Sequence, residues 1–299
     1  MELLVVGSVA YDSVETAAGK RDEMLGGSAT HFSLASALFT KPGLVAVIGN
    51  DFRDEDVTLL REHGVDLTGL TTANGPTFRW GGRYHADMNG RDTLFTQLNV
   101  FESFEPHLEA AHREASLVFL ANIHPALQQK VLDQVNSPGF VALDTMNLWI
   151  DIAREDLDAL LRHVDGLILN DEEARMLTGE SNLIEAARKV LTLGPRYVIL
   201  KKGEHGAFLM GEGVHFSLPA YPVTKVVDPT GAGDCFAGGF MGAIARVGNT
   251  APQTLRRAML YGTVTASYCV QGFSIEDLGK REIEDIDRRY ADLLSIVTV

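Results

Sequence analysis

The most constraining feature of the sequence is a glycine-rich turn that joins an extended segment to a helix. The turn covers residues 228–234 and reads Asp-Pro-Thr-Gly-Ala-Gly-Asp. Residues 221–227 before it are extended and apolar, whereas residues 235–245 after it repeat apolar side chains at helical spacing. The pattern therefore predicts a tight turn that opens directly into a helix.

The start of this helix is a suitable seat for a negatively charged group. The backbone N–H groups of Gly231, Ala232 and Gly233 lack intrahelical partners there, and the positive end of the helix dipole points outward with them. Phosphate groups bind at such helix ends, and glycine lets them come close because it has no Cβ.

The second acidic residue of the turn, Asp234, is a candidate catalytic base. A phosphate bound at the turn would repel this carboxylate, unless the carboxylate takes a proton beside a phosphoryl group in transfer. The alternative is an ordinary acidic residue in the first turn of a helix. Glycines at 238, 239 and 242 favour a special role for the helix. Each destabilises a helix by about 1 kcal/mol relative to alanine, which predicts close packing against a neighbour.

The whole run resembles the C-terminal signature of the PfkB (ribokinase-like) family of sugar and nucleoside kinases, D-x-T-G-A-G-D followed by small residues. It matches from Asp228 to Met241. The resemblance implies an α/β fold: a doubly wound, mostly parallel sheet flanked by helices, in one domain over residues 1–299 with a small β lid. It also implies ATP and Mg²⁺ as cofactors, and makes Asp228 and Thr230 candidates for binding a monovalent cation such as K⁺.

Composition limits the classes of partner. The chain has 299 residues and a net charge of −14, which argues against nucleic acid or an anionic membrane surface as a partner. Its two cysteines provide neither a disulfide framework nor a metal-ligand spacing. No apolar run approaches the length of a membrane span. We expect a soluble, cytoplasmic protein.

Apolar strand-like runs alternate with helical segments along most of the chain, which is typical of a parallel sheet. Strands are expected at 3–7, 44–48, 65–70, 117–121, 140–143, 166–169, 197–201 and 206–210, and helices at 54–63, 252–268 and 281–294. The P-loop motif G-x-x-x-x-G-K-[ST] is absent. The dinucleotide motif G-x-G-x-x-G is also absent, because Phe236 occupies the place of its third glycine.

Two segments depart from this alternation and are expected to form the lid, at about 11–25 and 75–99. Within the second segment apolar and polar residues alternate around Asn89-Gly90, a strong signal for a β-hairpin. In the family that the chain resembles, such a lid closes over the substrate, which would keep water away from the phosphoryl group. The resemblance also allows a homodimer formed through the lid.

Candidate substrate-binding residues follow the first strand. Asp12 lies just past its end, where ligands bind in open α/β sheets. The pair Gly26-Gly27 precedes a helix that Ser28 could cap, and the resemblance places this pair against substrate hydroxyls. His31 departs from the family pattern, which often has Asn there, although neutral imidazole can also both donate and accept. The alternatives are a solvated loop for Asp12 and helix packing for His31.

Asn170 and Glu173 permit two interpretations. An Asn followed three residues later by Glu is a capping box at a helix start. It is also the N-x-x-E motif of the family, which implies that the two residues help hold Mg²⁺, mainly through water. Both can be true together. Residues 144–149 at the end of another strand could also line the crevice, or Trp149 could simply pack.

A second glycine turn is a candidate site for the nucleotide phosphates. The run from Lys201 and Lys202 through Gly203 to Gly206 resembles the family's K-x-G-x-x-G. Side chains alternate along a strand, so at most one of the two lysines is expected to reach ATP.

Together these patterns predict an ATP-dependent kinase that phosphorylates a hydroxyl of a small sugar. Asp234 would be the general base and the turn from Gly231 to Gly233 the anion hole. A nucleoside kinase of the same family remains an alternative, as does a non-catalytic binding protein with this fold. The intact Asp234 argues against the binding protein, because a binder needs no base beside a phosphate.

Overall fold

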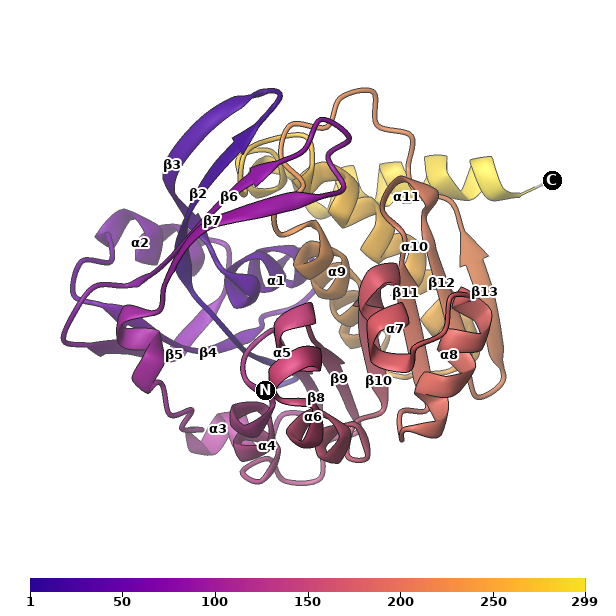
Figure 1. The fold of residues 1–299 in the computed structure, drawn as a ribbon, viewed down its shortest axis with the longest axis horizontal. Helices are drawn as coiled ribbons and strands as arrows, with labels where there is room; N and C mark the ends of the chain where they lie inside the picture. Colours follow the sequence, from indigo (N-terminus) through magenta and orange to yellow (C-terminus); the bar gives the residue numbers. More distant parts are fainter. Residues whose placement is uncertain (299) are drawn as a thin grey trace.

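The computed structural model describes residues 1–298 and contains a large, mixed β-sheet covered by helices on both faces (Figure 1). Within the described residues this main sheet has nine strands, in the order β13-β12-β11-β10-β9-β8-β1-β4-β5. Strands β12 and β13 are antiparallel to their neighbours, and the other pairs are parallel. The bounds are β1 Leu3–Val6, β4 Gly43–Gly49, β5 Asp66–Ala73, β8 Leu117–Leu120, β9 Phe140–Asp144, β10 Gly166–Asn170, β11 Tyr197–Lys201, β12 Ala207–Gly211 and β13 Val214–Leu218.

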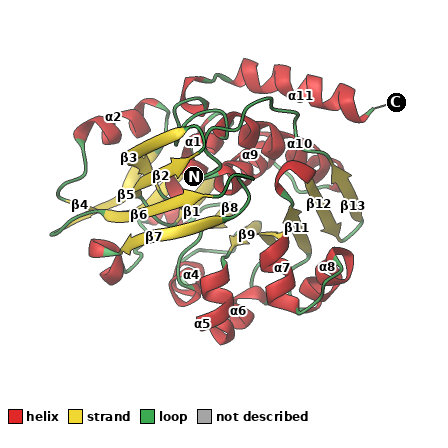
Figure 2. Ribbon diagram, turned by 45° about the horizontal axis from the view of Figure 1, so that its top comes forward, coloured by secondary structure: helices red, strands yellow, loops and turns green. Residues whose placement is uncertain are grey.

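Continuous apolar strands are buried on both sides, so the sheet separates two hydrophobic cores. In β1, Leu3 and Val5 face one core, and Leu4 and Val6 face the other. Figure 2 separates the two helical layers. One layer contains α1 Ser28–Ala37, α2 Asp54–Glu62, α9 Ala232–Val247, α10 Pro252–Cys269 and α11 Ile283–Val297. The other contains α3 Ala110–Arg113, α4 Pro125–Leu132, α5 Asn147–Ile152, α6 Arg154–Leu161, α7 Asp171–Thr178 and α8 Leu183–Thr192.

The glycines of α9 allow this helix to pack against its neighbours almost backbone to backbone. A Cβ at Gly238 would lie 2.5 Å from the carbonyl oxygen of Phe32 in α1, and one at Gly242 would lie 2.8 Å from Phe39. A Cβ at Gly239 would overlap Thr265 in α10. The close packing predicted from the three glycines is confirmed, and it fixes α9 between α1 and α10.

A second, four-stranded sheet, called the small sheet below, projects from one side of the molecule (indigo to purple in Figure 1). Its order is β3-β2-β6-β7, with bounds β2 Ala10–Thr16, β3 Gly19–Gly26, β6 Phe78–Tyr84 and β7 Arg91–Gln97. Strands β6 and β7 form the hairpin predicted around Asn89-Gly90. Strands β2 and β6 pair parallel, so the sheet is not wholly antiparallel.

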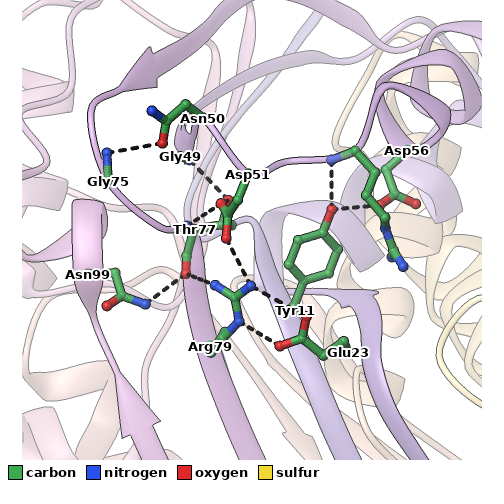
Figure 3. Close-up of polar contacts among 11 residues, drawn as sticks. Tyr11, Glu23, Gly49, Asn50, Asp51, Asp56, Gly75, Thr77, Arg79 and Asn99 are labelled. Atoms are coloured by element: carbon green, nitrogen blue, oxygen red, sulfur yellow. Dashed lines mark hydrogen bonds and ion pairs between the residues drawn. The ribbon is translucent and has the colours of Figure 1, made fainter.

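A polar network attaches the base of the small sheet to the main sheet (Figure 3). Arg79 in β6 lies between two carboxylates, 2.6 Å from Glu23 in β3 and 2.8 Å from Asp51 after β4. Asp51 also accepts hydrogen bonds of 2.7 Å from the backbone N–H and the hydroxyl of Thr77. On the other side, the Tyr11 hydroxyl donates to Asp56 at 2.9 Å. Charged and polar groups therefore fix the position from which the small sheet projects.

Several local predictions differ from the structure. Residues 221–227 form an irregular and largely exposed segment rather than a strand, because no neighbouring strand pairs with them. The N-cap of α1 is Gly27, with φ of 95°, so the prediction that Ser28 caps this helix is wrong by one residue. Asp12 lies inside strand β2 rather than in a loop. Strand β13 and helices α6 and α8 have no counterpart among the predicted elements. No helix within residues 1–298 is long and apolar enough to cross a membrane.

Candidate active site

The glycine turn begins α9, as the sequence predicts, and the helix already includes the last residues of the turn, from Ala232 onward. Gly231 is the N-cap, with φ of 74°, and Ala232 is already helical. The N–H of Ala232 donates to the carbonyl of Pro229 at 3.2 Å, so it is not free. Within residues 1–298, the N–H groups of Gly231 and Gly233 have no hydrogen-bond partner. These two groups are the candidate anion seat.

Asp234 lies in the first turn of α9, at the carboxyl-end edge of the main sheet. Burial raises the pKa of its carboxyl well above its ordinary value, and the charge of Asp144 raises it further, while Lys201 opposes the shift. The helix start therefore combines a basic carboxylate with two free N–H donors.

One ammonium group lies among three carboxylates beside this turn. Lys201, at the end of β11, has its Nζ 3.8 Å from Oδ1 of Asp144 at the end of β9. A Cβ on Gly233 would lie 2.8 Å from this Nζ, so the ammonium contacts the first turn of α9. Burial lowers the pKa of Lys201, but the charges of Asp144, Glu173 and Asp234 outweigh burial and raise it. Lys201 is therefore the lysine of the pair that reaches the site.

Asp144 begins the segment 144–149 that the sequence offered as a possible lining of the crevice, but no chemical role was predicted for its carboxylate. Its only sequence signal is its place at the carboxyl end of a buried strand. Burial raises the pKa of its carboxyl, against the attraction of Lys201.

Asn170 and Glu173 form the capping box at the start of α7. The N–H of Glu173 donates to Oδ1 of Asn170 at 2.8 Å, and the N–H of Asn170 donates to Oε2 of Glu173 at 2.7 Å. The capping prediction is confirmed. Burial raises the pKa of Glu173 to about 7. Because the cap occupies only Oε2, Oε1 of Glu173 stays available within the described residues.

Asp12 lies on the opposite side of the glycine turn. It is buried, and its Oδ2 lies 3.4 Å from the N–H of Gly27. A Cβ on Gly26 would overlap this carboxylate, so glycine is required there. Burial raises the pKa of Asp12 to about 7, and the charge of Asp228 contributes to the shift.

Asp228 holds the backbone around the turn. The carboxylate is fully buried, and it accepts hydrogen bonds from the N–H groups of Thr230 at 2.8 Å and Ser274 at 3.1 Å. Both oxygens are thus engaged. The hydroxyl of Thr230 lies 3.2 Å from the Tyr84 hydroxyl of β6, which joins the turn to the small sheet.

His31 packs beneath the glycine turn. Its Nδ1 lies 3.0 Å from the carbonyl of Gly27 and must be the donor, which leaves Nε2 as a buried acceptor without a partner. Burial lowers the pKa of His31, so the imidazole is neutral. A Cβ on Gly231 would overlap the ring, and this contact explains the need for glycine at the N-cap. Ser28 bonds to Ser8, with 3.1 Å between the hydroxyl oxygens.

The second glycine turn connects β11 and β12 and contains the short 3₁₀ helix η2 Gly203–His205. Gly203 and Gly206 have φ of 54° and 83°, in the region that favours glycine. A Cβ on Gly203 would lie 3.1 Å from Oδ1 of Asn89, at the tip of the β6–β7 hairpin. The small sheet therefore reaches from the base near Asp12 to this turn, and the predicted site residues surround a single region.

Comparisons with known proteins agree with this arrangement. A family model described as pfkB family carbohydrate kinase matches residues 2–277. A cytidine kinase from Thermococcus kodakarensis is 31% identical over 253 residues, which cover 82% of this chain and 89% of that protein.

Solved structures match the fold over almost the whole chain. A ribokinase II from E. coli, in complex with ATP and Mg²⁺, is 20% identical, with a TM-score of 0.81 and coverage of 97% of this chain and 99% of that one. A nucleoside kinase from Burkholderia thailandensis, in complex with inosine, is 18% identical, with a TM-score of 0.79 and coverage of 98% and 99%. At these sequence identities, the similarity shows that the chain shares the fold of these two proteins.

Proposed function

Since the chain belongs to the PfkB family of carbohydrate kinases and is therefore a phosphotransferase, we propose that it transfers the γ-phosphoryl group of ATP to a hydroxyl of a small sugar. The observation that carries this proposal is the first turn of α9. There Asp234 lies beside two free N–H groups and the ammonium of Lys201.

Asp234 accepts the proton of the acceptor hydroxyl while the hydroxyl oxygen bonds to the γ-phosphorus. The bond from this phosphorus to the bridging oxygen breaks, and ADP leaves. The raised pKa of Asp234 makes its carboxylate a better proton acceptor. The N–H groups of Gly231 and Gly233 and the ammonium of Lys201 stabilise the negative charge on the phosphoryl oxygens. The turn from Gly203 to Gly206 would hold the remaining phosphates.

Magnesium suits the residues at the start of α7. When bound, it neutralises charge on the β- and γ-phosphates. Glu173 and Asn170 would hold it through water, with Oε1 of Glu173 facing the ion. Burial and the charge of Asp144 raise the pKa of Glu173 to about 7, and a bound cation would favour its ionised form. Potassium near Asp228 and Thr230 remains a proposal that rests on the family resemblance.

The acceptor would lie between the small sheet and the glycine turn. The Asp12 carboxylate could accept hydrogen bonds from two neighbouring hydroxyls, with Gly26 and Gly27 close to the same groups. His31 would tune the choice of acceptor from beneath the turn. A nucleoside is the second candidate, because the cytidine kinase relative is 31% identical over most of its length. A furanose ring offers neighbouring hydroxyls both as a free sugar and within a nucleoside.

The small sheet would act as a lid that excludes water during transfer. Its strand β7 exposes Leu94 and Phe95, which supports a homodimer through this sheet. Light scattering at several protein concentrations would test the dimer. A cytoplasmic location also remains a proposal, supported by composition.

The direct test measures ADP release with MgATP and separate panels of pentoses, hexoses and nucleosides. With one of these panels, we expect the protein to release ADP at a rate well above its rate with water alone. Release from sugars but not nucleosides selects the sugar proposal, and the reverse selects the alternative. Wild-type protein that binds ATP yet phosphorylates neither class would contradict both.

A further inference from the structure

Arg91 is a positively charged residue of the small sheet to which neither the sequence patterns nor the proposed mechanism gives a role. It begins β7, directly after the β6–β7 hairpin. In the antiparallel register it lies opposite Tyr84. Directly opposed residues of antiparallel strands place their side chains on the same face of the sheet, so Arg91 shares the face of Tyr84.

Two contacts place this face over both glycine turns. The Tyr84 hydroxyl lies 3.2 Å from the hydroxyl of Thr230, next to the start of α9. Two residues before Arg91, Asn89 contacts the turn at Gly203, where a Cβ would lie 3.1 Å from its Oδ1. Arg91 therefore lies between the seat for the transferred phosphoryl group and the turn for the other phosphates.

The local surroundings leave the guanidinium free. Within residues 1–298, Arg91 makes no ion pair, and its Cζ lies 5.7 Å from the centre of the Trp80 ring. The Trp80 indole lies across Gly82, where a Cβ would overlap it. Burial raises the pKa of Glu173 and of Asp234, and the positive charge of Arg91 opposes both shifts, which agrees with its place near these carboxylates.

The two arginines of β6 differ from Arg91 in this respect. Arg79 is 2.6 Å from Glu23, and Arg83 is 3.1 Å from Glu15. Both are already neutralised by a carboxylate of the same small sheet. Within residues 1–298, Arg91 is therefore the arginine of the β6–β7 hairpin that has no carboxylate partner and can meet an anionic ligand.

We propose that Arg91 binds the γ-phosphoryl group of ATP from the small sheet and stabilises its charge during transfer. This inference rests on the proposed function. A guanidinium binds two phosphate oxygens with parallel hydrogen bonds, which an ammonium cannot do. Lys201 supplies one cation to the phosphoryl group from the main sheet, and Arg91 supplies a second from the small sheet. The position of the small sheet thereby responds to the γ-phosphoryl group and not to ADP.

The test compares two nucleotides and needs no knowledge of the acceptor. Calorimetry measures the Kd of Mg²⁺-AMP-PNP and of Mg²⁺-ADP for wild type, Arg91→Ala and Arg91→Lys. We expect Arg91→Ala to weaken AMP-PNP by about 10–100-fold, the range for hydrogen bonds to a charged group, and ADP by less than about threefold. Arg91→Lys keeps the positive charge but cannot donate two parallel hydrogen bonds. Its Kd for AMP-PNP should therefore lie between those of wild type and Arg91→Ala.

Arg83→Ala is the matched control, because it removes an arginine of the paired strand whose side chain is 54% exposed and bound to Glu15. It should leave both Kd values unchanged. Equal weakening of ADP and AMP-PNP in Arg91→Ala would overturn the inference, as would an unchanged AMP-PNP affinity. If wild type bound neither nucleotide, the proposed function itself would fail.

Discussion

Asp234 combines two properties that a general base needs. Its carboxylate is basic because burial and Asp144 disfavour the charged form, and it lies next to the seat for the group in transfer. Asparagine has nearly the same shape but cannot take the proton. The residue can therefore be tested with little change in packing.

Asp234→Asn should lower kcat by about 10²–10⁴-fold, the usual contribution of a general base. ATP affinity should stay the same or increase, because a negative charge beside the phosphates is removed. Steady-state kinetics and nucleotide calorimetry measure the two effects. Turnover close to that of wild type would contradict the proposed mechanism.

The pH dependence should report Asp12, whose pKa is raised to about 7. Only the ionised carboxylate can accept hydrogen bonds from two hydroxyls, so protonation weakens binding of the acceptor. We expect kcat/KM for the acceptor to be constant above about pH 7 and to fall below it. The same parameter in Asp12→Asn should be lower, and the fall that remains at low pH should come from the base Asp234 and from Glu173, whose pKa values are also raised. A wild-type limb near pH 4, the ordinary range of a carboxyl, would contradict the assignment.

Residues that are contiguous in the sequence could be predicted, and residues that meet through the fold could not. Asp234 and its two glycines form one motif, so the local pattern and the family resemblance were enough to propose them as site residues. The meeting of Asp144 with Lys201 depends on the strand order β9-β10-β11, which no local pattern contains. His31 also meets the turn through the fold, since its ring packs under Gly231, and its proposed effect on the choice of acceptor acts from this position.

Helix α7 shows how one element can serve stability and chemistry at once. Its capping box uses Oε2 of Glu173 and leaves Oε1 free. The sequence motif predicted the cap correctly, since capping depends on residues only three positions apart. The proposed magnesium role depends on the neighbouring strands and remains untested.

Glu173→Gln should increase the Mg²⁺ concentration needed for half-maximal activity by about tenfold, because the amide lacks the negative charge that attracts the ion. Stability should fall by about 1 kcal/mol or less, since an amide oxygen can still accept the capping bond. Magnesium titrations and thermal melts separate the two effects.

Asn182→Ala is the control for this experiment, because Asn182 caps α8 by accepting from the N–H groups of Ile184 and Glu185. It should lower Tm without changing the Mg²⁺ requirement. A Glu173→Gln protein that melts earlier but needs no more Mg²⁺ would reduce Glu173 to a capping residue.

At the scale of the whole molecule, the small sheet depends on a few polar contacts at its base. Asp51 accepts three of them, from the backbone and hydroxyl of Thr77 and from Arg79. The sequence predicted the β6–β7 hairpin from alternation and from Asn89-Gly90, and it assigned residues 11–25 to the same lid. It could not predict the attachment, because Asp51 and Arg79 lie on separate segments.

Asp51→Ala should lower the free energy of unfolding by about 1–3 kcal/mol, because it leaves the partly buried donors of Thr77 unpaired. The loosened base should also raise KM for the acceptor more than KM for ATP. Thermal melts, kinetics and limited proteolysis of the β6–β7 hairpin check these effects. Asn50→Ala, which alters a neighbouring exposed side chain, is the comparison. Equal proteolysis of both variants would show that Asp51 does not anchor the sheet.

The glycines of α9 carry a consequence for how such a protein can diversify. The helix that carries Asp234 has no room for even a methyl group at three positions. Under the proposed function, the face of the small sheet and the start of α1 would surround the acceptor. Substitutions in those outer segments can alter the choice of acceptor while the base stays in place. The residues that would select the acceptor are therefore separate from the helix that would carry the catalytic base.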